Sequence, residues 1–372
     1  MVETPVAVFR HTLYKPSERF IPDQASHLGR PVIMIARDPI IGLVEGLHAE
    51  SLSARDGFSR FRYTVLRDDR VLRALLLEQG VGVVHAHFGV EGMYAQRATQ
   101  HLGLPQATTL HGYDVTVSDH ALISSRSPAW IHYGLGRRRF LDRSPLLICV
   151  SEYIRERAIA LGARPESTVV VGTGIDTVAI SPSRVPEAPI VLHVGRLVEK
   201  KGTRYLLEAF ARVLEIEESA RLRIVGDGPL RGALEALASA LGISGAVEFL
   251  GAQGQDRVIA EMRDARVLAL PSVTAATGDA EGLGQVVLEA AAVGRPVVVT
   301  ANGGMRDAAI DDVTGLVVSE RDAGGLAEAL LALLSDAGLA AKLGAAGRTF
   351  VEQRFDLKSQ AAKVRQLYEE IG

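Results

Sequence analysis

The strongest chemical signal in the sequence is a short basic turn, Gly195-Arg-Leu-Val-Glu-Lys-Lys-Gly202. It directly follows an apolar run and precedes a helical pattern that begins at Thr203. Arg196 offers a forked donor, Lys201 a point charge, and the helix N-terminus unpaired backbone N–H groups. These three features together suit a diphosphate, and the alternative is a basic turn that is merely solvated. No Walker A loop or Gly-x-Gly-x-x-Gly occurs, so the sequence lacks the ATP and dinucleotide fingerprints.

Two glutamates, Glu281 and Glu289, lie eight residues apart in a glycine-rich segment. Glu281 falls in a turn after a predicted strand, and Glu289 falls within the helical pattern that follows. Gly282 and Gly284 leave backbone N–H groups uncovered, so a ligand can approach them closely. Each carboxylate can accept hydrogen bonds from one diol, and two such sites suit a ligand that carries both a sugar and a ribose. Taken alone, such a pair is more often a solvated helix face, but the glycine-rich entrance and the strand-end position favour a ligand.

A histidine at a strand end is the third signal, in His111-Gly112-Tyr-Asp114 after the apolar run at 106–110. Ligands of open α/β sheets bind beyond the carboxyl ends of strands, which places His111 where a ligand is expected. A purely structural histidine is the alternative. Gly112 and Asp114 favour the functional interpretation, because a short acidic turn could fix the orientation of the imidazole.

Two weaker clusters have simpler alternatives. His85 and His87 point to the same side of a predicted strand, but no third ligand follows at a suitable spacing, so we expect no metal site. Arg137, Arg138 and Arg139 form a basic stripe with aromatic neighbours that could rest on an anionic membrane surface. We favour a solvated helix face for that stripe, with the membrane surface as the alternative.

The elements that must position these residues alternate regularly along the chain. Short apolar runs predict strands, and the amphipathic stretches between them predict helices, as in βαβ units with parallel sheets. The strands are predicted at 6–9, 32–36, 81–85, 106–110, 146–150 and 168–171, and again at 190–194, 221–225, 247–250, 266–270, 296–300 and 315–318.

The two sets of strands predict two doubly wound domains. We expect a first domain at 1–178, a proline-rich linker at 179–189 and a second domain at 190–356. A last helical pattern at 357–372 either caps the second domain or, as we predict, crosses back to the first.

Composition bounds the class of protein. The 372 residues are 47% hydrophobic and 23% charged, which is an ordinary globular balance. A net charge of −3 gives no general basis for binding nucleic acid, and the single cysteine rules out a disulfide framework. With no apolar run of 18 residues and no recognisable signal peptide, we expect a cytoplasmic protein. Among 41 basic residues only six are lysines, and two of those are the adjacent Lys200 and Lys201.

The chain resembles the retaining glycosyltransferases of family 4, which have the GT-B fold of two Rossmann-like domains. The resemblance rests on the motifs at 195–202, 281–289 and 111–114, which match in type, order and spacing. It extends to Gly226-Asp-Gly228 and to the segments 294–297 and 174–176. The segments 16–21 and 85–89 look like the branch that builds colanic acid and related bacterial exopolysaccharides.

The resemblance implies roles residue by residue. Arg196 and Lys201 would neutralise the diphosphate of a nucleotide-sugar donor, and Glu289 would hold its ribose hydroxyls. Glu281 would hold the hydroxyls of the transferred sugar, and His111 would lie against that sugar from the first domain. The implied donor-binding set also includes Gly195, Gly226, Leu250, Gly251, Gln253, Gly282, Leu283 and Gly284, with Gly112 and Asp114 on the donor-sugar or acceptor side.

The resemblance also implies a mechanism without metal or cofactor. No Asp-x-Asp lies at a predicted strand end. The family is usually described as using front-side attack, in which the leaving phosphate takes the proton of the acceptor. The segment at 251–255 should face the base, and since it holds no carboxylate for guanine's donor edge, UDP is favoured over GDP.

Two loops depart from the family pattern, so their contacts cannot be transferred. Many relatives have a glycine-rich loop after the first strand, whereas here Phe9 is followed by Arg-His-Thr-Leu-Tyr-Lys-Pro. The relatives' Gly-Gly-x-Pro-Glu appears here as Gly303-Gly-Met-Arg-Asp307.

The sequence therefore predicts a glycosyltransferase that moves a hexose from a nucleotide-diphosphate sugar to a glycan, lipid-linked or small-molecule acceptor. Exopolysaccharide or cell-surface glycan synthesis is the expected setting, in the cytoplasm, with peripheral membrane association through Arg137, Arg138 and Arg139 as the alternative location. A GT-B phosphorylase or epimerase, and a non-catalytic nucleotide-sugar-binding protein, remain as alternatives.

Overall fold

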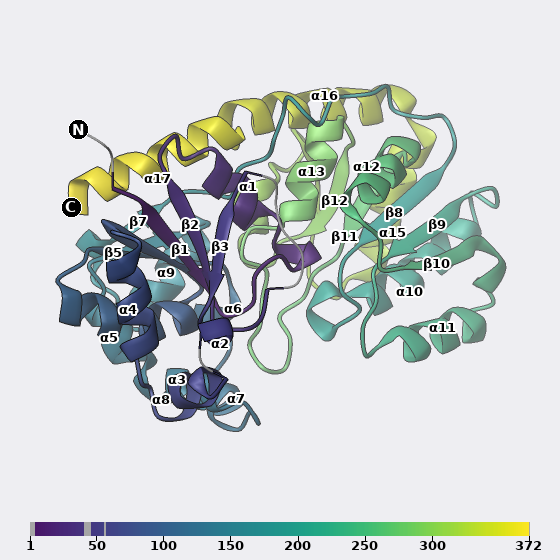
Figure 1. Ribbon diagram of the computed structural model, residues 1–372. Coiled ribbons are helices and arrows are strands. Elements are labelled where there is room, and N and C mark those ends of the chain that lie inside the picture. The colour runs from purple at the N-terminus through teal and green to yellow at the C-terminus, as the bar shows by residue number, and fades with distance from the viewer. Residues whose placement is uncertain (1–3, 41–45, 56, 372) are drawn as a thin grey trace. The chain divides into compact units, whose positions relative to one another are not determined.

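The computed structural model describes residues 4–40, 46–55 and 57–371, which form two compact units. The first unit comprises residues up to Gly174 together with Leu357 onward, and the second comprises Ile175–Asp356 (Figure 1). The C-terminal helix α17 (Leu357–Ile371) thus belongs to the first unit, where Val364 and Tyr368 enter the apolar core.

The first unit is built on a parallel sheet of seven strands in the order β3-β2-β1-β4-β5-β6-β7. Its order reverses beside β1, as in doubly wound folds, so the ends of β1 and β4 flank the switch point. The strands are β1 (Val6–Arg10), β2 (Val32–Ala36), β3 (His48–Ser51), β4 (Val83–His87), β5 (Gln106–Leu110), β6 (Leu146–Cys149) and β7 (Thr168–Val170).

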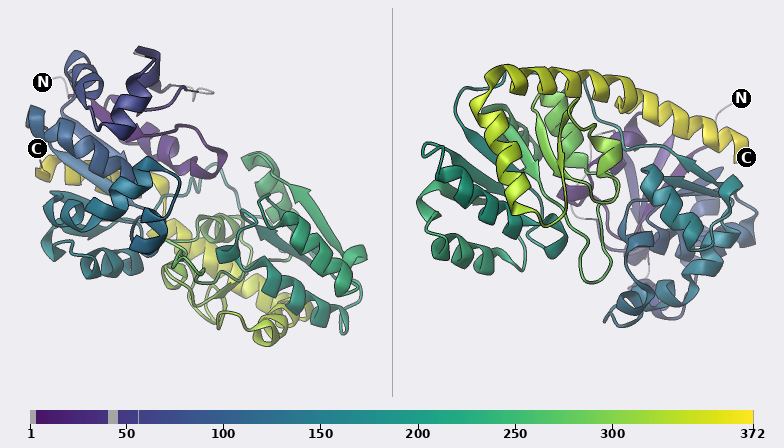
Figure 2. Two further views of the ribbon diagram at one scale, coloured as in Figure 1. Left: turned by 90° about the horizontal axis from the view of Figure 1, so that it is seen from below. Right: turned by 180° about the vertical axis from the view of Figure 1, so that it is seen from behind.

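Helices cover both faces of this sheet (Figure 2). They are α1 (Phe20–Ser26), α2 (Leu52–Arg55), α3 (Ser59–Val65), α4 (Arg70–Glu78), α5 (Gly89–Leu102), α6 (Tyr113–Thr116), α7 (Asp119–Ile123), α8 (Pro128–Arg143), α9 (Glu152–Ala160) and α17, with 3-10 turns at Pro16–Glu18 and Pro165–Ser167.

The second unit repeats the plan with six parallel strands in the order β10-β9-β8-β11-β12-β13. They are β8 (Ile190–Val194), β9 (Arg221–Val225), β10 (Val247–Gly251), β11 (Val267–Leu270), β12 (Val297–Thr300) and β13 (Gly315–Val318). The segment 179–189 before β8 holds neither helix nor strand. The prediction of two Rossmann-like parallel-sheet domains is confirmed.

The helices of the second unit are α10 (Thr203–Leu214), α11 (Arg231–Ala240), α12 (Gln255–Asp264), α13 (Gln285–Val293), α14 (Met305–Ala308), α15 (Ala323–Ser335) and α16 (Ala337–Arg354), with 3-10 turns at Glu199–Lys201 and Ser244–Ala246. Buried Leu206, Phe210 and Leu330 from α10 and α15 pack with strand residues in one apolar cluster. Among the described residues no single helix is long and apolar enough to cross a bilayer, and α15 with α16 passes that test only as a pair bent by 101°.

Candidate active site

The basic turn after β8 lies at the carboxyl edge of the second sheet, as predicted. Two glycines let other chain segments approach it: a Cβ on Gly226 would lie 1.9 Å from the carbonyl oxygen of Gly195, and one on Gly202 would lie 1.8 Å from that of Pro271. Both glycines have positive φ, of 131° and 63°. No larger residue fits either position without moving backbone, so the turn, β9 and the segment after β11 meet at one place.

A buried histidine fixes the base of this turn. The Nε2 of His193 on β8 lies 3.0 Å from the hydroxyl oxygen of Thr203, and its Nδ1 lies 2.9 Å from the carbonyl oxygen of Ala269. Because a carbonyl only accepts, Nδ1 carries the proton and Thr203 donates to Nε2. Burial lowers the pKa of His193 to about 4, so the ring is neutral and joins β8, α10 and β11.

Lys201 and Glu281 form an ion pair with 2.7 Å between Nζ and Oε1. The two side chains are 15% and 8% exposed, so the pair is largely shielded from water. Ser272 donates to the same carboxylate oxygen at 3.3 Å. Burial raises the pKa of Glu281, but Lys201, Lys200 and Ser272 together outweigh it and lower that pKa to about 2. Glu281 is therefore an anion at neutral pH, suited to accept hydrogen bonds rather than to donate a proton.

The backbone of Glu281 is held by the loop that follows β12. Asn302 Oδ1 accepts from the N–H of Glu281 at 3.1 Å, and the N–H of Gly304 donates to the Glu281 carbonyl at 2.9 Å. The Asn302 amide donates in turn to Glu320 at 2.7 Å and to Thr274 at 3.0 Å. The sequence reasoning missed Asn302, because a single asparagine beside two glycines predicts only a turn.

The Gly303-Gly304 pair is the part of the family pattern that this loop keeps, whereas Arg306 and Asp307 stand where the relatives have Pro-Glu. Gly303 has φ of 53°, and a Cβ there would lie 2.2 Å from the carbonyl oxygen of Glu281. The two glycines let the loop close on Glu281, and the residues after them lie in the short helix α14.

Glu289 lies half-buried on α13, where it accepts a hydrogen bond from Gln255 Nε2 at 3.0 Å. Gly284 caps the start of this helix with φ of 75°. Gln255 begins α12, one element after β10, so the contact joins the predicted ribose carboxylate to the predicted base segment. The sequence reasoning did not pair these two residues.

The remaining predicted donor residues flank this edge of the sheet. The N–H of Gly226 donates to the carbonyl of Gly251 at 2.8 Å, and Gln253 donates to the carbonyl of Leu250 at 2.7 Å. Arg196 is exposed, and its side chain has no hydrogen bond or ion pair among the described residues. The structure thus brings Lys201 and Glu281 together and leaves Arg196 open to an anion. Gly282, Leu283 and Gly284 are buried beside Glu281.

In the first unit, the ring of His111 is held by another histidine rather than by Asp114. His87 Nδ1 lies 3.0 Å from His111 Nε2, and the His111 ring packs on Phe88 and Phe20 with centroids 4.4 and 4.9 Å apart. Burial lowers the pKa of His111 well below its usual range, so the half-buried ring is neutral at pH 7.

Asp114 instead organises the backbone of the turn. Its carboxylate accepts from the N–H groups of Gly89 at 2.7 Å, His111 at 2.6 Å and Gly112 at 3.2 Å. The expectation that the acidic turn orients the imidazole is therefore wrong in detail. Strands β4 and β5 are adjacent, and His87 lies opposite Thr109, two residues before His111. This strand pairing is the signal from which a contact between His87 and His111 could have been predicted.

His85, which we did not expect to bind a metal, has both ring nitrogens engaged by hydrogen bonds. Its Nε2 lies 2.7 Å from Thr109 Oγ1, and its Nδ1 lies 2.6 Å from the Tyr368 hydroxyl on α17. Within the described ranges no cluster of three or more His, Cys, Asp or Glu side chains could hold a metal ion.

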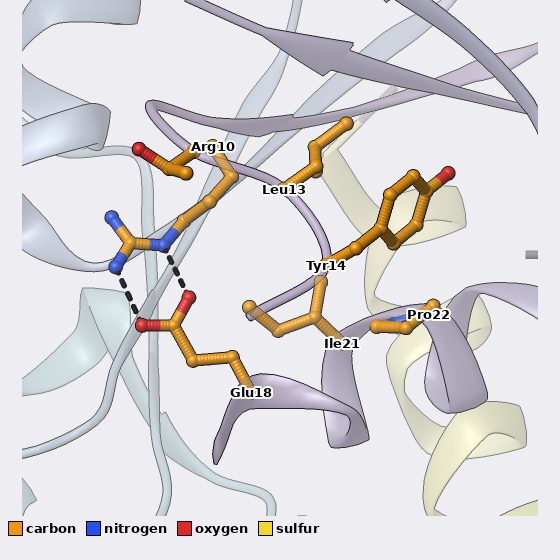
Figure 3. Close-up of a pocket in the computed structure, with 7 residues that line it drawn as sticks. Arg10, Leu13, Tyr14, Glu18, Ile21 and Pro22 are labelled. Carbon is orange, nitrogen blue, oxygen red and sulfur yellow. Dashed lines mark hydrogen bonds and ion pairs between the residues drawn. The ribbon is translucent and has the colours of Figure 1, made fainter. Parts of the chain in front are cut away.

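The loop after β1, where relatives carry glycines, is built around a buried arginine. Arg10 forms two hydrogen bonds to Glu18, of 3.0 and 2.9 Å, and a further ion pair with Glu91. Its guanidinium carbon lies 4.1 Å from the centroid of the Phe88 ring, beside His111. Figure 3 shows Glu18 facing Arg10 in a pocket that is also lined by Leu13, Tyr14, Ile21 and Pro22. The sequence reasoning missed this network.

The predicted basic stripe on α8 is corrected. Arg137 is 2% exposed and donates to the carbonyls of Asp114 and Val117, at 3.2 and 2.8 Å, while also pairing with Asp119. It therefore supports the turn after His111 and cannot meet a membrane. Only Arg138 and Arg139 are exposed.

Comparisons with known proteins agree with this architecture. The sequence profile described as Glycosyltransferase Family 4 matches residues 5–179, and the profile described as Glycosyl transferases group 1 matches residues 179–350. The two matches together span residues 5–350, so the chain belongs to glycosyltransferase family 4 and has the GT-B fold.

Two curated relatives are similar to this chain over part of their length. It is 35% identical over 66% of its length to the colanic acid biosynthesis glycosyltransferase WcaL of Escherichia coli, of which the match covers 60%. It is 34% identical over 61% of its length to a GDP-mannose-dependent alpha-(1-6)-phosphatidylinositol monomannoside mannosyltransferase of Mycobacterium tuberculosis, of which the match covers 62%. The chain thus matches about three fifths of the length of each.

Solved structures share the fold at low identity. Anabaena Alr3699/HepE in complex with UDP and glucose superposes with a TM-score of 0.81 over 99% of this chain and all of that one, at 19% identity. Sucrose-phosphate synthase of Thermosynechococcus elongatus gives 0.82 over 99% of each chain at 22% identity.

Proposed function

We propose that this glycosyltransferase moves a hexose from a nucleotide-diphosphate sugar with retention of configuration and without a metal ion. The observation that carries the proposal is the Lys201–Glu281 pair at the strand end, with Arg196 exposed in the same turn as Lys201. A sugar diphosphate requires two groups. One is a cation that can contact its phosphates, and the other is a carboxylate that stays an anion.

The chemistry follows from the charge that develops. The bond between the anomeric carbon and the diphosphate oxygen breaks, and the acceptor hydroxyl forms a new bond to that carbon. The acceptor's proton goes to the departing diphosphate oxygen, which gains negative charge as the bond breaks. Lys201, Arg196 and the N-terminus of α10 stabilise that charge more in the transition state than in the ground state.

The other residues hold the donor. Glu281 accepts hydrogen bonds from hydroxyls of the transferred sugar, and Glu289 accepts them from the ribose. Gln255 lies against Glu289, so its amide turns from this carboxylate when the ribose arrives. His111 is neutral and packs on Phe88, so it would act toward a ligand as a hydrogen-bonding group and not as a cation.

For the nucleotide we propose UDP, because residues 251–255 hold no carboxylate to accept from guanine. GDP is the second candidate, since the mycobacterial relative is named as GDP-mannose-dependent. Thermal unfolding with each nucleotide separates them, because the bound one raises the melting temperature.

For the acceptor we propose a glycan or a lipid-linked sugar in cell-surface polysaccharide synthesis, on the cytoplasmic side. The named roles of WcaL and of the phosphatidylinositol mannoside enzyme support this proposal. A screen of nucleotide sugars for slow hydrolysis tests the donor half without any acceptor. Tight donor binding with no hydrolysis over hours would instead favour a non-catalytic sugar-binding protein.

A further inference from the structure

The helix α17 brings one tyrosine to a central strand of the first sheet. Tyr368 is 2% exposed, and its hydroxyl lies 2.6 Å from Nδ1 of His85, which is fully buried on β4. The Tyr368 and His85 rings meet edge to face, with centroids 5.6 Å apart. On the other side of the imidazole, Nε2 lies 2.7 Å from the Thr109 hydroxyl on β5. Hydrogen bonds to two separate elements therefore fix both nitrogens of this ring.

These hydrogen bonds select one tautomer of His85. Burial lowers the pKa of His85 to about 3, so the ring is neutral and only one nitrogen carries a proton. The phenol of Tyr368 is a stronger acid than the aliphatic hydroxyl of Thr109, so it is the better donor. Tyr368 therefore donates to Nδ1, and the Nε2–H group of His85 donates to Thr109.

His85 in turn supports the histidines at the end of the strand. His85 and His87 are two residues apart on β4, so their side chains leave the same face of the sheet. Their rings pack with centroids 4.4 Å apart, and the His87 ring stacks on His111 at 5.3 Å. The hydrogen bond of 3.0 Å between His87 Nδ1 and His111 Nε2 completes the series. We call Tyr368, His85, His87 and His111 the histidine row.

Packing alone does not explain the histidine row. Its three inner members are at most 2% exposed, and apolar side chains would fill the same space without the cost of desolvating polar atoms. A buried network that is held by hydrogen bonds keeps its members in one arrangement. The row ends at His111, which is only half-buried. It therefore leads from α17 to a ring that a ligand can reach.

We propose that Tyr368 is a positioning residue that acts on His111 through the histidine row. The Tyr368 hydroxyl fixes the plane and the tautomer of the His85 ring, against which the His87 ring rests. His87 then presents Nδ1 to His111, so His111 keeps one orientation and one tautomer. The inference rests on the proposed function, in which His111 is a hydrogen-bonding group toward the ligand. It gives α17 a part in the reaction besides its place in the apolar core.

The test is Tyr368→Phe in the full chain, which removes the hydroxyl and keeps the ring. In ¹⁵N NMR spectra of histidine-labelled protein, His85 should no longer be held in a single tautomer, and the His111 signals should shift. The kcat for donor hydrolysis should fall about threefold, the size of a small loss of alignment. The KM for the donor should stay unchanged, because the proposed nucleotide contacts lie outside the histidine row.

A double mutant separates positioning from a general effect on stability. Adding Tyr368→Phe to His87→Phe should not lower kcat further, because the link to His111 is already broken. Tyr94→Phe is the matched control, since its hydroxyl lies 2.8 Å from Nδ1 of His132 in the same unit and outside the histidine row. It should lower the melting temperature by a few degrees, as Tyr368→Phe does, and leave kcat and the His111 signals unchanged.

His85→Phe is a second variant, which gives the same test if Tyr368→Phe does not fold. It keeps a ring beside His87 and loses both hydrogen bonds, so kcat and the His111 signals should change at least as much. Unchanged His111 signals in either folded variant would overturn the proposal. So would an equal loss of kcat in Tyr94→Phe, or losses that multiply when Tyr368→Phe and His87→Phe are combined. A wild type that hydrolyses no donor would instead contradict the proposed function, and the spectra would still decide whether Tyr368 positions His111.

Discussion

Replacing Lys201 by alanine tests the assignment on which the proposed mechanism depends. Its Nζ lies 2.7 Å from Glu281 Oε1, in a pair that is mostly shielded from water. The pKa of Glu281 falls from 4.5 to about 2, a change of roughly 3 kcal/mol at 1.36 kcal/mol per unit. Lys201 is the largest of the groups that lower this pKa, so we expect Lys201→Ala to destabilise the fold by about 2 kcal/mol.

The contribution of Glu281 to the stability of the fold depends on pH with a definite sign. A carboxyl whose pKa is depressed by folding stabilises the fold above its unfolded pKa, and that stabilisation disappears as the pH falls through the folded value. For Glu281 the window runs from about pH 4.5 down to about pH 2. The difference in melting temperature between wild type and Lys201→Ala should therefore be full at pH 7 and shrink as the pH falls below about 4.5.

Activity and stability should separate in a second variant. Lys201→Ala should lower transfer or donor hydrolysis by a factor of about 10²–10³, the scale seen when one fixed donor to a developing anion is lost. In Lys201→Ala/Glu281→Gln no buried charge is left unpaired, so much of the stability should return while the activity stays low. Lys200→Ala is the matched control, since Lys200 pairs with Asp279 at 3.1 Å and should cost less than tenfold. Near-normal turnover in Lys201→Ala, or an equal loss in Lys200→Ala, would refute the reasoning.

Three further expectations address the donor, the Glu281 loop and the histidine pair. At a hundredfold excess over its Kd, UDP should stabilise the fold by about 2.7 kcal/mol and so raise the melting temperature more than GDP does. A larger shift with GDP would reverse the nucleotide assignment. Asn302→Asp replaces the amide that donates to Glu320, so it should destabilise the fold by about 1–3 kcal/mol and lower kcat. A variant that stays stable and active would mean that this loop does not position Glu281. His87→Phe should lower kcat several-fold, and ¹⁵N NMR spectra should show that the His111 ring is no longer held in one tautomer. His87→Asn keeps a polar atom near the position of Nδ1, so it should restore much of the kcat and of the single tautomer. Equal behaviour of the two variants would contradict a positioning role for His87.

The sequence predicted the sheets because apolar runs and turns alternate so regularly. It missed β3, whose residues His-Ala-Glu-Ser carry no strand pattern and are extended only because they pair with β2. It also misjudged Arg137, although Tyr133, Arg137 and Phe140 share one side of α8 and two of the three are aromatic. Helical spacing was the available signal that Arg137 faces inward.

The sequence named the candidate site residues one by one, but it did not indicate which of them are in contact. Lys201 and Glu281 were assigned to different parts of the donor, and nothing along the chain shows that residues eighty apart meet at 2.7 Å. That contact depends on β11 lying next to β8. Arg10 was missed for a similar reason, since its partners Glu18 and Glu91 come from separate elements.

In the proposed function, the ion pair between Lys201 and Glu281 also affects how the donor binds. Without a ligand, the Glu281 carboxylate neutralises most of the positive charge of Lys201. A bound diphosphate must therefore share the Lys201 ammonium with this carboxylate. As phosphate oxygens draw Lys201 toward them, Glu281 loses part of its compensation and becomes a stronger acceptor for sugar hydroxyls. Free diphosphate without a sugar would loosen the pair and leave Glu281 without that replacement, whereas the intact donor supplies both. The pairing therefore favours the complete nucleotide sugar over its nucleotide product, which also promotes release of the product after transfer.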